Sequence, residues 1–132
     1  MKYLLDTNIC IYIIKKKPSQ VFEKLETLQI NDIGISAITL AELEYGISKS
    51  TFPEKNKIAL IKFLAPLEIL PFTEKAAEIY GKIRSYLEKT GSIVGTLDLF
   101  IGAHAKSEPL VLVTNNVTEF SRIPNLKIEN WV

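Results

Sequence analysis

Three acidic side chains lie in apolar stretches of the chain, where folding alone would not place a charge. Asp6 follows a short apolar run, Glu42 lies within a longer one, and Asp98 lies between two leucines. An ionised side chain is costly to bury unless it is paired or bound to a metal ion. The chain has only one Cys and one His, so no cluster of nitrogen or sulfur ligands accompanies these acids. Three oxygen donors of this kind favour a hard cation, Mg²⁺ or Mn²⁺, held partly by water.

Each of the three acids also has a purely local interpretation. Thr39-Leu40-Ala41-Glu42 matches a capping box, in which the glutamate closes only its own helix. Asp98 can favour the N-terminal dipole of a helix that begins near Thr96, and Asp6 can cap a helix that follows it. These interpretations are compatible with metal binding, because a capping residue can also face a cation. They do not explain why these acids lie in apolar segments while other glutamates lie on polar faces.

Strand and helix patterns alternate along the chain. Short apolar runs predict strands at residues 2–5, 33–35, 67–70, 110–113 and 126–131. Apolar residues at helical spacing, with capping residues and prolines at the ends, predict six helices: 9–17, about 19–29, one capped by Ser36 or Thr39, one ended by Pro66, one from Thr73 to Gly91, and one capped by Thr96. We therefore expect a single α/β domain over residues 1–132, with a mostly parallel central sheet flanked by helices.

The three acids are expected to meet at one edge of this sheet. Asp6 ends the first strand, and ligands of open α/β sheets bind at the carboxyl ends of the strands. Glu42 and Asp98 are each expected in the first turn of a helix that starts from the same edge. Their like charges should then raise the pKa of at least one of the carboxyl groups.

Composition narrows the class of protein. Sixteen Lys and Arg residues against fifteen Asp and Glu residues give a net charge of +1, so the chain does not coat nucleic acid by charge alone. The single cysteine, Cys10, excludes a disulfide framework and a cysteine-based zinc site. Asp6 interrupts the N-terminus before a signal-peptide core can form, and no apolar stretch approaches the roughly 18 residues of a membrane span. We expect a cytoplasmic protein without membrane contact, in which the only histidine, His104, is a packed or half-exposed helix residue rather than a catalytic one.

Four short motifs follow one another along the chain: Leu4-Leu5-Asp6-Thr7-Asn8, Ala41-Glu42-Leu43-x-x-Gly46, Asp98-Leu99-x-Ile101-x-Ala103-His104-Ala105 and Leu112-Val113-Thr114-Asn115-Asn116-x-x-Glu119-Phe120. Together they resemble the PIN-domain ribonucleases, and most of all the VapC-type toxins of bacterial toxin–antitoxin pairs. The resemblance runs from Met1 to the closing residues 128–131. It implies a PIN-like fold and a Mg²⁺- or Mn²⁺-dependent endoribonuclease.

The resemblance also implies roles for particular residues. Asp6, Glu42 and Asp98 match the family's catalytic acids and metal ligands, with Glu42 either a ligand or the residue that orients the attacking water. A fourth acidic position falls on Asn116, where many members carry aspartate, and this difference leaves open whether one or two metal ions bind. Glu119 can supply the missing charge, as a ligand or through water. Side chains that can hydrogen-bond the carboxylates or a phosphate are Thr7, Asn8, Thr114 and Asn116, of which Thr7 and Asn8 also suit plain helix caps.

Partners are implied by the same resemblance. They are an RNA substrate, a small VapB-type antitoxin that silences the toxin, and a second copy of the chain in a homodimer. The low net charge favours a structured RNA, such as a loop of tRNA or rRNA, over random single strands. The predicted helix is apolar nearly all round over residues 9–14, whereas a helix that packs on one face needs only one apolar stripe. The additional apolar surface agrees with a dimer built on helices.

Other functions stay open at this point. One alternative is a PIN-like DNA nuclease, although the chain has no room for a DNA-binding appendage. Another is a receiver-like Mg²⁺-binding domain, although no lysine follows the strand at 111–113. A third is a catalytically inactive interaction module, which the presence of all three acids disfavours.

Overall fold

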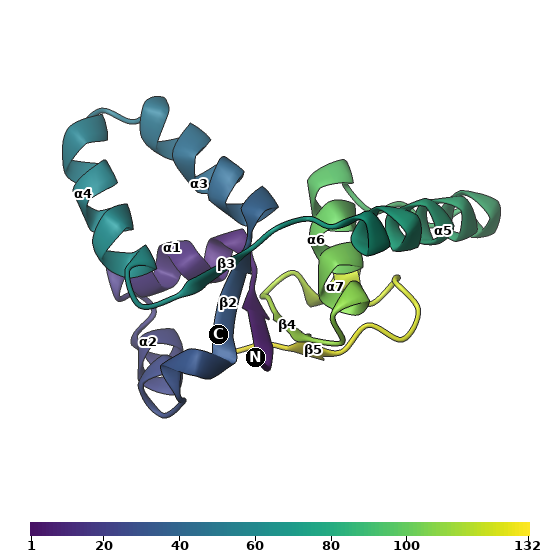
Figure 1. Cartoon of the computed structure of the whole chain (residues 1–132), viewed down its shortest axis with the longest axis horizontal. Helices are drawn as coiled ribbons and strands as arrows, with labels where there is room; N and C mark the ends of the chain where they lie inside the picture. Colours follow the sequence, from purple (N-terminus) through teal and green to yellow (C-terminus); the bar gives the residue numbers. More distant parts are fainter.

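A five-stranded parallel sheet lies at the centre of the computed structural model, which describes residues 1–132 (Figure 1). The strands are β1 (Tyr3–Leu5), β2 (Ile33–Ser36), β3 (Glu68–Leu70), β4 (Val111–Val113) and β5 (Ile128–Glu129). They lie in the order β3-β2-β1-β4-β5, and every neighbouring pair is parallel. The predicted α/β class is confirmed, and the sheet is entirely rather than mostly parallel.

Helices cover both faces of the sheet. They are α1 (Thr7–Lys15), α2 (Ser19–Glu26), α3 (Ala37–Ser48), α4 (Pro53–Leu64), α5 (Glu74–Thr90), α6 (Thr96–Ser107) and α7 (Val117–Phe120). In Figure 1, α1 to α4 lie on one side of the sheet and α5 to α7 on the other. None of these helices has both the length and the apolar composition that a membrane crossing requires.

The central strand contributes to two apolar cores. Leu5 packs with Ile35, Val113 and residues of α1 to α4, whereas Leu4 packs with Leu112 and residues of α5, α6 and α7. Successive side chains of a strand point to opposite faces, so β1 is held from both sides. This burial explains why its sequence is continuously apolar, and it fixes the position of the residue that follows the strand.

Several predicted boundaries are wrong, each for a local reason. The first helix spans Thr7–Lys15 rather than 9–17, because Asp6 caps it and Lys16 adopts a left-handed conformation with φ of 57°. The second helix ends at Glu26 rather than near 29. The next residue, Thr27, donates its hydroxyl to the carbonyl oxygen of Lys24 in the last turn. The last strand is limited to Ile128–Glu129, because only two of its residues pair with β4. The single turn α7 was missed, since four residues are too few to show a helical repeat.

Two glycines of α5 are expected to respond oppositely to the same substitution. Gly81 lies within the helix, and no atom lies within 4 Å of the position that a Cβ would take. Gly81→Ala should therefore raise the free energy of unfolding by about 0.5–1 kcal/mol. Gly91 follows the last residue of the helix at φ of 73°, so Gly91→Ala should lower the free energy of unfolding by about 1 kcal/mol. Urea denaturation of both variants measures the two effects. If both substitutions changed the free energy of unfolding in the same direction, the helix would not end at Gly91 as described.

Candidate active site at the carboxyl edge of the sheet

Asp6 lies directly after β1, and its side chain is 4% exposed. It caps α1, because its Oδ1 accepts a hydrogen bond from the backbone N–H of Thr7 at 2.8 Å. Its other oxygen, Oδ2, accepts a hydrogen bond from the hydroxyl of Thr114 at 2.7 Å. The local and the functional interpretations of Asp6 therefore coexist, since the capping carboxylate also faces the residues that follow β4.

Glu42 reaches across to α1 instead of closing its own helix. The cap of α3 is Ser36 rather than Thr39, because the Ser36 Oγ accepts the N–H of Ile38 at 3.1 Å. The predicted capping box is therefore absent, and Glu42 lies in the second turn of α3 rather than in the first. Its Oε1 instead accepts a hydrogen bond from the Thr7 hydroxyl at 3.0 Å. Thr7 thus connects Glu42 to Asp6.

Asn116 connects the remaining acids. Its backbone N–H donates to the hydroxyl oxygen of Thr114 at 3.0 Å. Its side-chain amide donates to Asp98 Oδ2 at 3.1 Å and to Glu119 Oε2 at 2.9 Å. Asp98 lies in the first turn of α6, as predicted. A chain of hydrogen bonds therefore runs from Glu42 through Asp6 to Asp98 and Glu119, and neutral side chains lie between the acids.

Glu119 acts as a helix cap for α6. The helix begins after Gly95, which has no side chain and takes the place expected for Thr96. The Oε1 of Glu119 accepts a hydrogen bond from the Gly95 N–H. This bond and the one from Asn116 hold the pKa of Glu119 below its usual range. Gly95 was not predicted at this position; because glycine has no side chain, a side-chain cap for this helix must come from another residue.

Asn8 does not join this network. Its side chain is exposed and makes no hydrogen bond within the chain, so it is the one predicted site residue that the fold does not bring to the others. The acids also do not form a closed cage, because no three Asp, Glu, His or Cys side chains gather as a ready metal cluster. The carboxylates are held apart by Thr7, Thr114 and Asn116.

The acids nevertheless influence one another strongly. The pKa of Asp98 is raised to about 6, mainly by burial and then by the negative charges of Asp6, Glu119 and Glu42, while the hydrogen bond from Asn116 opposes this rise. Burial also raises the pKa of Asp6, against the lowering effect of its two hydrogen bonds. The expectation that at least one carboxyl pKa is raised is confirmed.

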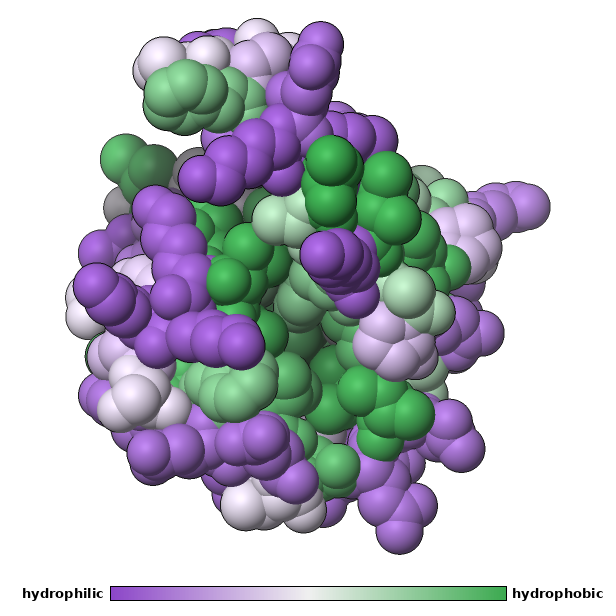
Figure 2. Space-filling view, turned by 90° about the vertical axis from the view of Figure 1, so that its left-hand side faces the viewer, coloured by the Kyte–Doolittle hydropathy of each residue, from purple (hydrophilic) through white to green (hydrophobic).

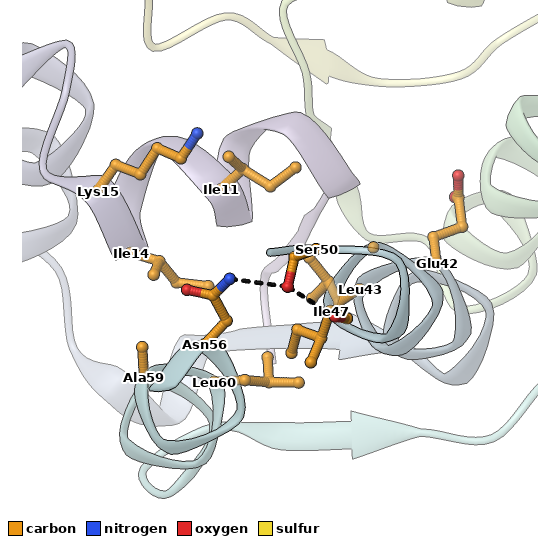
Figure 3. A pocket seen from close by; sticks show the side chains of 11 residues that line it. Ile11, Ile14, Lys15, Glu42, Leu43, Ile47, Ser50, Asn56, Ala59 and Leu60 are labelled. Atoms are coloured by element: carbon orange, nitrogen blue, oxygen red, sulfur yellow. Dashed lines mark hydrogen bonds between the residues drawn. The ribbon is translucent and has the colours of Figure 1, made fainter. Parts of the chain in front are cut away.

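An apolar groove leads away from Glu42. It has a volume of about 320 Å³ and lies between α1, α3 and α4, where Ile11, Ile14, Leu43, Ile47 and Leu60 line it. Glu42 lies at one end of the groove in Figure 3. Figure 2 shows the same side of the molecule as an apolar, hollowed surface bordered by hydrophilic side chains.

The pKa of Asp98 predicts how stability depends on pH. Folded Asp98 binds its proton more tightly than an unfolded chain, whose ordinary pKa is 3.8, so its stabilising contribution is complete below that value and is lost as pH rises through about 6. Without added metal at pH 7.5, Asp98→Asn should melt about 3–5 °C higher than the wild type, on the order of 1 kcal/mol once solvent screening is allowed for. At pH 4 this difference should vanish.

Two variants serve as controls in the same thermal melts. Glu26→Gln removes an exposed charge that has no partner and should leave the melting temperature unchanged at either pH. Asp6→Asn should not gain stability as Asp98→Asn does, because an amide NH₂ cannot accept the hydrogen bond from Thr114. An equal rise of the melting temperature in all three variants would show that Asp98 has no special electrostatic environment.

Comparison with known proteins places this site in a family. A model described as the PIN domain matches residues 3–126. The chain is 52% identical over 132 residues to Ribonuclease VapC2 of Rickettsia felis, covering 99% of this chain and 98% of the relative. It is 45% identical over 131 residues to the tRNA(fMet)-specific endonuclease VapC of Salmonella typhimurium, covering 99% and 98%.

A solved structure agrees with these sequence matches. It is VapBC2 from Rickettsia felis bound to a DNA fragment from their promoter, and the TM-score is 0.94 at 50% identity, with 100% of both chains covered. The receiver-like alternative is therefore wrong, because the similarity to a different family extends over the whole fold. The chain belongs to the PIN domain family and, within it, to the VapC group.

Proposed function

We propose that this chain is an endoribonuclease toxin that requires Mg²⁺ or Mn²⁺ and is neutralised by a VapB-type antitoxin. The observation that carries the proposal is the hydrogen-bonded set of acids around Asp6 and Asp98 in a chain of the VapC group. Two relatives are named a ribonuclease and a tRNA endonuclease, which agrees with hydrolysis of an RNA phosphodiester.

The donor set suits a hard divalent cation. The candidate ligands Asp6, Asp98 and Glu42 offer only oxygen. The pKa of Asp98 is raised first by burial and then by the negative charges of its neighbours, and a bound cation would offset both effects. A bound Mg²⁺ or Mn²⁺ would make the attacking water easier to deprotonate and would neutralise charge at the phosphate. The two Glu119 oxygens accept hydrogen bonds from Gly95 and Asn116, so we assign to Glu119 the support of α6 and of Asn116.

The neutral side chains keep the carboxylates in place. The hydroxyls of Thr7 and Thr114 orient Glu42 and Asp6, and the amide of Asn116 orients Asp98. Glu42 is less restrained than Asp6, because only one of the Glu42 oxygens accepts a hydrogen bond within the chain. We therefore assign to Glu42 either metal ligation or the orientation of the attacking water.

The substrate is proposed to be a structured RNA with an exposed loop. The net charge of +1 gives little drive for binding random polyanions, so recognition must depend on shape. The relative from Salmonella typhimurium is named for tRNA(fMet), which makes a tRNA loop the first substrate to test.

The apolar groove beside Glu42 suits the proposed antitoxin. A bound segment that fills it would bury aliphatic side chains of α1, α3 and α4 and arrive next to a catalytic acid. The homodimer stays a prediction. Three apolar residues of α1 are buried in the core, whereas Ile11 and Ile14 are only partly buried and line the groove.

Loss of any principal acid should abolish cleavage. Asp6→Asn, Glu42→Gln and Asp98→Asn should each lower the rate by at least about 100-fold, roughly 3 kcal/mol of transition-state stabilisation. The measurement is cleavage of isolated tRNA(fMet) and of total RNA, with end mapping, in Mg²⁺ or Mn²⁺ and in EDTA. Glu26→Gln is the matched control and should cleave like the wild type. Cleavage that persists in EDTA would reject the metal requirement.

Asn116→Asp should exchange stability for metal affinity. The substitution removes the amide that donates to Asp98 and Glu119 and adds a negative charge between them. Without metal, its melting temperature at pH 7.5 should fall by several degrees. Saturating Mn²⁺ should then raise that temperature by more than it raises the wild type, because only the folded state binds the ion. A smaller Mn²⁺ shift than in the wild type would place Asn116 outside the metal site.

A further inference from the structure

The only histidine of the chain is completely buried and fully engaged. His104 lies on α6 with none of its side chain exposed. Its Nδ1 lies 2.7 Å from the hydroxyl of Ser36, and its Nε2 lies 2.9 Å from a carboxylate oxygen of Glu108. The rings of His104 and Phe72 pack nearly perpendicular to each other, with 5.7 Å between their centroids. The proposed chemistry at the acids makes no use of this group.

The hydrogen bonds around His104 run in one direction. An ionised Glu108 can only accept, so Nε2 carries the proton and donates to it. In the neutral imidazole, Nδ1 then accepts, and its donor is the Ser36 hydroxyl. The Ser36 oxygen in turn accepts the backbone N–H of Ile38. Every polar atom of the arrangement is therefore satisfied, with Ser36 as the donor to His104.

These bonds join two helices that carry different catalytic acids. Ser36 ends β2 and caps α3, the helix that carries Glu42. His104 lies further along α6, the helix that carries Asp98. No other side-chain hydrogen bond connects α6 with α3 or its cap. The bond between Ser36 and His104 is therefore the direct side-chain hydrogen bond between the two helices.

We propose that His104 is a positioning residue: through its hydrogen bond with Ser36, it fixes α3 and thus Glu42 relative to Asp98 on α6. The inference rests on the proposed function, since it assigns these acids to one metal-dependent site. His104 does not touch the reacting groups, because both it and Ser36 are completely buried and neither lines the groove beside Glu42. The arrangement of Glu108, His104 and Ser36 therefore serves the geometry of the acids and not nucleophilic attack by the serine.

Two substitutions of His104 separate its two bonds. The amide of asparagine lies near the position of Nδ1, so His104→Asn can still accept from the Ser36 hydroxyl but loses Glu108. The amide of glutamine lies near the position of Nε2, so His104→Gln can still donate to Glu108 but loses Ser36. Both variants remove the buried ring and should lose stability to a similar extent. They form a matched pair, because each variant keeps one of the two hydrogen bonds and only His104→Asn keeps the link to α3.

The test measures Mn²⁺ affinity by electron paramagnetic resonance, and kcat and KM for tRNA(fMet) cleavage, well below every melting temperature. His104→Gln should weaken Mn²⁺ binding and lower kcat by about 10-fold or more with little change in KM, whereas His104→Asn should stay within about threefold of the wild type. Val21→Ala, which opens a cavity in the core beside α2, should lower the melting temperature without changing either quantity.

The outcomes discriminate between the inference and the proposed function. Equal losses in the two His104 variants, or no loss in His104→Gln, would overturn the positioning role. Wild-type protein that binds Mn²⁺ but cleaves no RNA would contradict the proposed function alone, because the Mn²⁺ affinities of the two variants still decide the role of His104. Wild-type protein that fails to bind Mn²⁺ would overturn both.

Discussion

The carboxylate of Asp6 is buried at the end of a strand that is itself covered on both faces, and the surrounding structure must satisfy that charge. Each of its oxygens accepts one hydrogen bond, from the Thr7 backbone and from the Thr114 hydroxyl. These two bonds connect the start of α1 to the residue after β4, and so fix two parts of the chain at one edge of the sheet. Removal of either donor would leave part of a buried charge unsatisfied, which is among the more expensive defects in a folded protein.

The arrangement of the other acids is a compromise between folding and chemistry. Acids packed closely together would suit a cation but would repel one another without it. In this chain Thr7, Thr114 and Asn116 lie between the carboxylates and donate hydrogen bonds to them. The repulsion is reduced but still present, as the raised pKa of Asp98 shows. The helix that carries Asp98 is in turn stabilised by an acid, Glu119, whose charge is favourable at a helix start.

Features that depend on neighbouring residues were predictable, and features that depend on distant ones were not. The buried strands, the position of Asp6 and the ends of α5 at Thr73 and Gly91 follow from patterns a few residues long. The cap that Glu119 provides to α6 joins residues 24 apart, and the bond from His104 to Ser36 joins residues 68 apart. Such contacts have no signature within a short window of sequence. The resemblance to a family predicted that the acids share one site, but it did not indicate that neutral side chains separate them.

The cap of α6 has a consequence for the order in which the site can be completed. Asp6 and Asp98 are made before Thr114 and Glu119. During translation, a chain that already contains all three principal acids still lacks the hydroxyl that satisfies Asp6 and the carboxylate that starts α6. Long-range contacts of this kind cannot form until both partners have been synthesised. A protein proposed to attack RNA would therefore remain unfinished at its reactive edge until the ribosome has also added Thr114 and Glu119.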